Sequence, residues 1–192
     1  MQTDKDYSTN ILKAYLRYLK LERNYSINTI DAYKHDIRCL LDYCLEIGQN
    51  VLQLRLEDLQ NFAATIHEKG IGPTSQARIL SGVRSFYRYM LLDGYIGADP
   101  AELLESPNLG QHLPEVLSTP EVDKLEKGID LTGKEGQRNK AIIEVLFSCG
   151  LRVSELVNLK LSQLFLDEGF VQVIGKGSKE RLVPISKRAI KE

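Results

Sequence analysis

The chain has 192 residues, of which 43% are hydrophobic and 27% charged, and its net charge at pH 7 is −1. This composition is typical of a soluble globular protein, and the length suits one large domain or two small ones. The polar N-terminus does not resemble a secretory signal and no apolar run is long enough to span a membrane, so we expect a cytoplasmic protein without a membrane partner. The three cysteines and three histidines lack ligand spacing, so we expect reduced thiols and no metal site.

Hydrophobic residues in the first half repeat at the spacing of amphipathic helices, and cap residues and glycines divide them into four segments. The expected helices run over about 9–22 with Ser8 or Thr9 as the cap, from a cap at Ser26 or Asn28 to Ile47, over 56–68, and over 74–92. Gly48 and Gly70 follow the second and third segments, as is typical where helices stop. The first half therefore predicts a helical domain, which we place at residues 1–105.

The composition changes after the fourth expected helix. Four of the six prolines lie between residues 97 and 120, and the stretch from Ser106 to Pro114 is polar and aperiodic. Such a segment is typical of an interdomain linker, which we place at residues 106–116. Residues 117–192 then form the expected second domain.

The second half mixes helical and strand patterns, which predicts a fold that is mainly α with a small β-hairpin. Its expected elements are a short helix capped at Ser118, a helix at 136–148, a break at Gly150, a helix opening near Arg152, strands at 170–174 and 180–185, and a helix from Ser186.

Basic residues are concentrated in two parts of the chain, although the whole is close to neutral. Residues 71–92 contain Arg78, Arg84 and Arg88 and no carboxylate, and residues 170–192 contain six Lys or Arg against two acids. Local positive surfaces of this kind can neutralise nucleic-acid phosphates. Ordinary solvated faces would show the same pattern, so charge alone leaves both interpretations open.

The run GLRVSEL at residues 150–156 places Arg152 directly after a glycine, at the expected start of a helix. Backbone N–H groups at a helix start favour anions, and a guanidinium can bind two phosphate oxygens at once. Glu155 lies three residues on, on the same helix face, and could hold that guanidinium in place. Taken alone, an arginine at a helix start is more often structural than functional.

The run VIGKGSKERLVP at residues 173–184 places Lys176 between two glycines at the tip of the expected hairpin. A lysine there can reach into a neighbouring groove, and partial desolvation beside DNA could tune it as a proton donor. A solvent-exposed turn is the simpler interpretation of this run by itself. A Walker A loop is excluded, because Gly177 follows Lys176 where that motif requires Ser or Thr.

Together the two runs resemble the catalytic domain of the tyrosine site-specific recombinases of the phage-integrase family, close to the XerC/XerD type. The helical half is similar to the family's core-binding domain in the segments SINTIDAYKHDI at 26–37, TSQARILSGVRSFYRYM at 74–90 and GYIGADPAELL at 94–104. The resemblance implies a helical DNA-binding domain followed by an α+β catalytic domain, of which the chain contains the N-terminal part. It does not separate XerC-like, XerD-like and mobile-element recombinases.

The resemblance implies that a tyrosine hydroxyl attacks a DNA phosphodiester and forms a 3′-phosphotyrosyl link, which a 5′-hydroxyl later reverses without a cofactor. The implied partners are double-stranded DNA and other recombinase protomers, four of them on two sites. Arg152 matches the first catalytic arginine, Lys176 the general acid for the 5′-oxygen, and Glu155 a supporting position. The implied DNA contacts are Asn28, Thr29, Tyr33 and Lys34 on one helix and Ser75, Arg78, Ser81 and Arg84 on another, and we add Lys179 and Arg181 of the basic hairpin segment.

The family's remaining catalytic residues, a His-x-x-Arg run, a further His or Trp and the tyrosine nucleophile, are expected after residue 192. No histidine follows His112 and no tyrosine follows Tyr95, so we expect these 192 residues to bind DNA without cleaving it. Two alternatives stay open: a non-cleaving DNA-binding module that competes for recombination sites, and an unrelated helical interaction domain.

Overall fold

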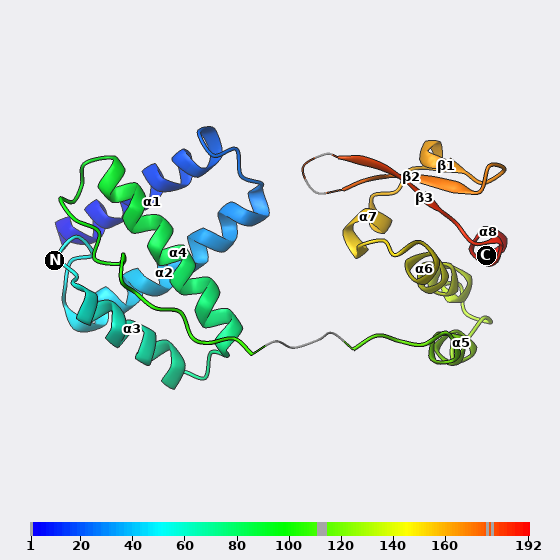
Figure 1. The fold of residues 1–192 in the computed structure, drawn as a ribbon, viewed down its shortest axis with the longest axis horizontal. Helices are drawn as coiled ribbons and strands as arrows, with labels where there is room; N and C mark the ends of the chain where they lie inside the picture. The colour runs from blue at the N-terminus through cyan, green and yellow to red at the C-terminus, as the bar shows by residue number, and fades with distance from the viewer. Residues whose placement is uncertain (1, 111–114, 176, 178) are drawn as a thin grey trace. The chain divides into compact units, whose positions relative to one another are not determined.

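The computed structural model describes residues 2–110, 115–175, 177 and 179–192. The chain forms two compact units, Met1–His112 and Leu113–Glu192, and the division between them falls within the stretch 106–116 that the sequence marks as a linker. In its described residues the first unit has four helices. The second unit has helices and a small sheet (Figure 1). The predicted fold class is therefore confirmed. No helix in the described part of the chain has the length and apolar character needed to cross a membrane.

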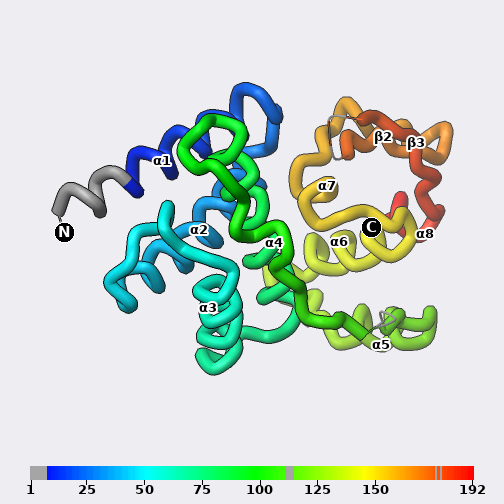
Figure 2. The backbone as a smooth tube through the Cα atoms, turned by 60° about the vertical axis from the view of Figure 1, so that its left-hand side comes forward, coloured from blue at the N-terminus to red at the C-terminus, as the bar shows by residue number. Residues whose placement is uncertain are grey.

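The first unit consists of α1 (Gln2–Leu21), α2 (Ile27–Ile47), α3 (Leu56–Glu68) and α4 (Pro73–Leu92). Helix α2 packs against both α1 and α4, and α4 also packs against α3 (Figures 1 and 2). Two of the predicted boundaries have the expected chemistry. The Ser26 hydroxyl accepts the Thr29 backbone N–H and caps α2, and Gly48 ends that helix in a left-handed conformation with φ 67°.

The prediction for the start of the first helix was wrong. Helix α1 begins at Gln2, so Ser8 and Thr9 lie inside it and do not cap it. The residues before Ser8 include no glycine or proline that would stop a helix. Ser8 and Thr9 are residue types that often cap helices, but no helix begins at them.

Large side chains fill the space between the four helices. The largest fully buried ones include Tyr15, Tyr87, Phe62 and Phe86, at 1% exposure or less. The buried phenol groups have hydrogen-bond partners: the Tyr87 hydroxyl donates to the Val51 carbonyl at 2.8 Å, and the Tyr15 hydroxyl donates to Ser85 at 2.9 Å. Both phenols are fully buried core residues, and burial raises the pKa of each.

The second unit contains four α-helices, a short 3₁₀ helix and three strands within its described residues. They are α5 (Thr119–Lys127), α6 (Gly136–Cys149), α7 (Val153–Val157), η1 (Leu161–Gln163), β1 (Leu164–Phe165), β2 (Phe170–Ile174), β3 (Glu180–Pro184) and α8 (Lys187–Lys191). The predicted cap at Ser118, the break at Gly150 and the helix starts near Arg152 and Ser186 are all confirmed.

The sheet is antiparallel in the order β1-β2-β3. The predicted hairpin is its β2–β3 pair, in which Val171 lies opposite Val183 and Val173 opposite Arg181. Strand β3 ends at Pro184, one residue earlier than predicted, and β1 was not predicted at all. Two residues are too few to show the alternation by which a strand is recognised in a sequence.

The core of the second unit is small. Its buried apolar cluster consists of Cys149, Leu151, Val171 and Val173. Large apolar side chains remain at the surface, among them Val157 at 73% exposure and Leu161 at 87%. Apolar burial alone therefore stabilises this unit less than the first, and ion pairs connect several of its elements.

One group of ion pairs connects α8 to α5 and α6. Arg188 of α8 pairs with Asp123 of α5 at 2.6 Å, with Glu144 of α6 at 3.0 Å, and with Glu126 of α5. Both glutamates are almost completely buried. Three carboxylates thus surround an arginine that, in the sequence, seemed to be part of a free basic surface.

A close helix contact in the first unit depends on a glycine. A Cβ atom placed on Gly82 of α4 would lie 2.9 Å from the Cβ of Asp36 on α2. That Asp36 atom is attached directly to the α2 backbone, so a larger residue at position 82 would push the two helices apart.

We therefore expect Gly82→Ala to destabilise the first unit by about 1–2 kcal/mol, because overpacking outweighs the gain in helix propensity. All nine tyrosines lie within residues 1–95 and the chain has no tryptophan, so tyrosine fluorescence during urea unfolding reports on this unit alone. Gly97→Ala is the matched control, since no atom lies within 4 Å of a Cβ added there. Equal midpoints for the two variants would contradict the close contact.

Candidate phosphate-binding centre and nucleic-acid interface

The first candidate site is built around Arg152 at the start of α7. Gly150 turns the chain out of α6 with φ 57°, and Arg152 follows as the residue that caps α7. The backbone N–H of Arg152 donates to Oε2 of Glu155 at 2.9 Å, and its Nη1 donates to Oε1 of the same carboxylate at 2.8 Å. The predicted support of Arg152 by Glu155 is therefore present in the structure. The Glu155 carboxylate also accepts the backbone N–H of Arg152, so this N–H at the helix start is not available to another anion.

Glu155 binds a second arginine as well. Arg181 of β3 donates from Nη1 to Oε1 at 2.9 Å and from Nη2 to Oε2 at 2.8 Å, which is the bidentate geometry of a strong ion pair. Sequence reasoning had placed Arg181 among the DNA contacts, but in the structure it faces the carboxylate. The Arg181 guanidinium, followed by the Arg152 backbone N–H, holds the pKa of Glu155 well below its ordinary value.

The arrangement leaves one cationic group exposed above a buried anion. The Glu155 side chain is 4% exposed, whereas that of Arg152 is 67% exposed. Arg152 uses Nη1 to reach Glu155, and Nη2 and Nε remain as donors on the exposed guanidinium. Two arginines on one carboxylate give the centre a net charge of about +1, and these donors can bind phosphoryl oxygens.

The β2–β3 hairpin passes close to this centre through Gly175. Its N–H donates to the Lys179 carbonyl at 2.7 Å and closes the turn. A Cβ on Gly175 would lie 3.0 Å from Nη1 of Arg181 and 3.3 Å from Oε1 of Glu155. Because residue 175 is a glycine, the chain at the end of β2 can pass directly beside Arg181 and Glu155. Lys176, the predicted general acid, lies outside the described residues, and Lys179 is exposed at the end of the turn.

The second candidate site is a depression of about 430 Å³ on the helical unit, between the first half of α2 and the second and third turns of α4. Five of the predicted DNA contacts lie on its walls: Asn28, Thr29, Tyr33, Arg78 and Ser81. The structure thus brings together residues that are about 50 positions apart in the sequence. Lys34 and Ser75 are not among the residues that line it.

Sequence reasoning missed Asp36, which lies at this depression and is 2% exposed. Its carboxylate forms an ion pair with Arg78, whose side chain is 47% exposed. Burial raises the pKa of Asp36, and the neighbouring Arg78 opposes that shift. Asp36 stands in the same segment as the predicted contacts, but no local pattern connects it to an arginine 42 residues away.

Arg84, another of the predicted DNA contacts, does not line the depression. Its Nη1 donates to the Leu104 carbonyl and its Nη2 to the Ser106 hydroxyl, both at 2.8 Å. In this structure Arg84 attaches the segment after α4 to that helix. A DNA contact through Arg84 would have to use the N–H donors that these two bonds leave, or replace the bonds.

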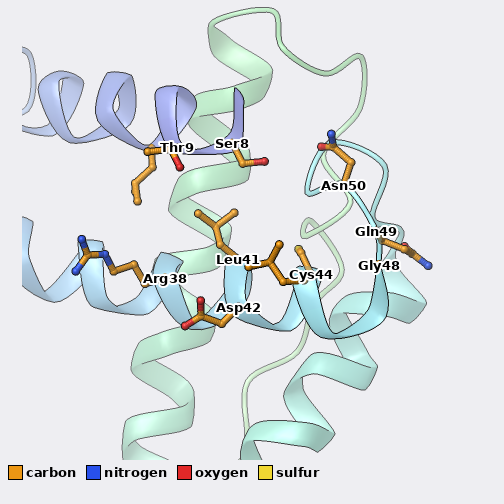
Figure 3. Close-up of a pocket in the computed structure, with 11 residues that line it drawn as sticks. Ser8, Thr9, Arg38, Leu41, Asp42, Cys44, Gly48, Gln49 and Asn50 are labelled. Carbon is orange, nitrogen blue, oxygen red and sulfur yellow. The ribbon is translucent and has the colours of Figure 1, made fainter. Parts of the chain in front are cut away.

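A separate depression of the helical unit, shown close up in Figure 3, lies between α1 and the second half of α2. Its volume is about 360 Å³. Arg38 and Asp42 line it, together with Gln49 in the turn after α2. None of the predicted DNA contacts lies there. Within the described residues, no group of three or more His, Cys, Asp or Glu side chains is arranged to hold a metal ion.

The arginine centre predicts an acid-dependent stability of the second unit. Because the pKa of Glu155 in the folded chain is below its ordinary value of 4.5, its stabilising contribution is complete above that value and is lost as the pH falls below it. We expect the amide-exchange protection of α7 and β3 to be constant from about pH 7 to 5 and to decline below about pH 4.5. Glu155→Gln should lower the protection at neutral pH and remove this decline.

Glu168→Gln is the control for this measurement, because Glu168 is an exposed residue in the turn before β2. It should keep the acid profile of the unaltered chain. If the Glu155→Gln chain instead followed that profile, another group would be responsible for the decline.

Comparison with known proteins agrees with the architecture of both units. Residues 12–94 match the phage integrase N-terminal SAM-like domain, and residues 115–192 match the phage integrase family. The chain is 38% identical over 183 residues to tyrosine recombinase XerD of Listeria monocytogenes, covering 94% of this chain and 61% of that protein. It is 42% identical over 185 residues to tyrosine recombinase XerD of Pseudomonas aeruginosa, covering 94% of this chain and 60% of that protein.

A solved structure of a lambda integrase dimer bound to a COC' core site shares the fold, with a TM-score of 0.73 at 16% identity over 92% of this chain and 48% of that one. The chain spans about 61% of the length of the XerD relative from Listeria monocytogenes. The two family models occur in the order expected from the sequence, and the XerD relatives match across both. The chain therefore belongs to the phage integrase family of tyrosine recombinases and is similar to its XerD members.

Proposed function

We propose that the chain provides the DNA-binding unit and part of the phosphoryl-transfer centre of a site-specific DNA recombinase. The observation that carries this proposal is the exposed Arg152 guanidinium held on the buried Glu155 carboxylate. Phosphoryl transfer places negative charge on non-bridging oxygens in the transition state, and a fixed guanidinium stabilises that charge without having to reorganise.

In the proposed reaction a tyrosine hydroxyl attacks a DNA phosphodiester and forms a 3′-phosphotyrosyl link. Arg152 binds the phosphoryl oxygens, and Glu155 together with Arg181 keeps its guanidinium in place. Lys176 is proposed to protonate the leaving 5′-oxygen. We propose double-stranded DNA and further recombinase protomers as partners of the complete enzyme, and the cytoplasm as its place of action.

The depression on the helical unit is proposed to contact the duplex backbone. Its hydroxyl, amide and guanidinium groups suit phosphate and sugar contacts, which position a protein on DNA without reading its sequence. The first turns of α2 and α4 contain no acidic residue, so no side-chain charge there opposes an approaching phosphate.

A second candidate function is a DNA-binding module that occupies recombination sites without cleaving them. The distribution of tyrosines favours it for the 192 residues by themselves. All nine lie within residues 1–95, in the unit that does not contain Arg152. Tyr15, Tyr43, Tyr87 and Tyr89 are buried in that unit.

We expect the chain to bind duplex DNA with an affinity that falls steeply with salt. For about four to six phosphate contacts, the slope of log association constant against log salt should be about −4 to −5. Replacing the ion pair by Asp36→Asn with Arg78→Ala leaves the net charge unchanged and should make the slope less steep by about 0.9. Fluorescence anisotropy of a labelled duplex measures both values. A slope near zero for the unaltered chain would refute DNA binding.

We also expect the 192-residue chain to form no covalent adduct with DNA, because no tyrosine lies in the unit that contains Arg152. Correct placement of a nucleophile contributes many powers of ten in rate, which the other groups cannot replace. A nicked suicide duplex run on a denaturing gel would trap a 3′-phosphotyrosyl product. Adduct formation would exclude the non-cleaving module and require one of the nine tyrosines as the nucleophile.

A further inference from the structure

The exposed Arg23 lies in the turn between α1 and α2, beside the stacked rings of Tyr25 and Tyr33, which form an aromatic ladder. The guanidinium carbon of Arg23 is 5.9 Å from the centroid of the Tyr25 ring. The Tyr25 ring is stacked in turn on Tyr33, with centroids 6.0 Å apart and 15° between the ring planes. Arg23 is exposed, whereas both tyrosines are partly buried. The Tyr25 ring thus positions Arg23 at the surface, and Tyr33 of α2 positions the Tyr25 ring.

The backbone of this turn explains how Arg23 reaches Tyr25. Asn24, between them, has φ 50° and is the one non-glycine residue in the described part of the chain with a positive φ. Such a conformation carries a steric penalty and persists where its surroundings hold it. Here the Arg23 N–H donates to the Tyr18 carbonyl and the Tyr25 N–H to the Leu19 carbonyl, which attach both sides of the turn to the end of α1.

The ladder leads directly into the depression of the helical unit. Tyr33, its innermost ring, lines that depression with Asn28, Thr29 and Arg78. Tyr33 also contacts the buried Tyr15 edge-on, with centroids 6.2 Å apart, so the ladder is anchored in the core. Arg23 therefore extends the polar surface of the depression toward the α1–α2 turn.

The charge of Arg23 also distinguishes it from other arginines of the chain. Arg78, Arg181 and Arg188 form ion pairs with buried carboxylates, whereas within the described residues Arg23 forms no ion pair with a carboxylate. The phenol groups of Tyr25 and then Tyr18 raise the pKa of the Arg23 guanidinium, so part of its N–H edge faces these hydroxyls. A guanidinium has five N–H donors, and the others can donate to an oxyanion.

We propose that Arg23, positioned by Tyr25 and Tyr33, is a DNA phosphate contact that extends the nucleic-acid interface beyond the depression. The inference rests on the proposed DNA-binding function and adds to it Arg23 and Tyr25, which neither charge clustering nor the family motifs indicated. Because an exposed stacked guanidinium recognises the backbone, its contribution is the same for every duplex sequence.

The test compares variants by fluorescence anisotropy of two unrelated labelled duplexes over a range of salt concentrations. Arg23→Ala should weaken binding to both duplexes equally and make the salt slope less steep by about 0.9, the value for one phosphate. The matched control is Arg38→Ala, which removes the same charge from an exposed residue at the other depression of the same unit. It should leave the slope unchanged.

The role of the ladder is tested separately from the charge. Tyr25→Phe keeps the stacked ring and should bind as the unaltered chain does, whereas Tyr25→Leu should reduce both affinity and slope. The double variant Arg23→Ala with Tyr25→Leu should bind no more weakly than Arg23→Ala alone, because the ring acts through the arginine. Additive losses would overturn the positioning role of Tyr25.

The outcomes separate this inference from the proposed function. If the unaltered chain binds with the expected slope but Arg23→Ala has the same slope, or if Arg38→Ala changes the slope equally, the inference fails and DNA binding stands. If the unaltered chain does not bind either duplex at low salt, both proposals fail.

Discussion

A carboxylate that is removed from water needs a cation or hydrogen-bond donors beside it, and an arginine can supply both while its outer edge stays in solvent. This pairing recurs in both units. Asp36 holds Arg78 in the helical unit, Glu155 holds Arg152 and Arg181, and Glu126 and Glu144 hold Arg188. In each case the acid is at most 5% exposed at its side chain and the arginine is at least 39% exposed. The positions of these arginines are therefore set from within the fold.

This pairing bears on the proposed phosphoryl transfer at the Glu155 centre. A mobile surface arginine would lose rotamer entropy on each encounter with a phosphate, whereas a guanidinium already bound at one edge loses less. Glu155 also connects two elements, because Arg152 caps α7 and Arg181 lies in β3. The same ion pairs thus position the candidate catalytic arginine and join a unit whose buried apolar cluster has four residues.

The pairing also changes how the charge of the chain is understood. The segment 170–192 contains six Lys or Arg, yet Arg181 and Arg188 are used within the unit to neutralise buried acids. In the helical unit, Arg84 binds the chain after α4. A count of basic residues therefore overestimates the free positive surface. Arg152, Arg78 and Arg23 are the exposed guanidinium groups that geometry favours for phosphate contacts.

Local chemistry in the sequence determined much of this protein. Helices begin or end at Ser26, Gly48, Ser118 and Gly150. The contacts that define these ends lie within a few residues, so the ends could be predicted without knowledge of the fold. The support of Arg152 by Glu155, three residues apart, could be predicted for the same reason. The two motif runs and the helical segments also sufficed to indicate the family.

Tertiary structure decided what depends on residues that are distant in the chain. The second partner of Glu155 is 26 residues away, and Asp36 and Arg78 are 42 residues apart, so no local periodicity could reveal either pair. Three further features depend on how the elements pack. They are the position of Gly175 next to Glu155, the hydrogen bonds of Arg84 to the segment after α4, and the two-residue strand β1. The start of α1 shows the converse: Ser8 and Thr9 have the side chains of caps, but a side chain caps a helix only where the backbone leaves the helical conformation.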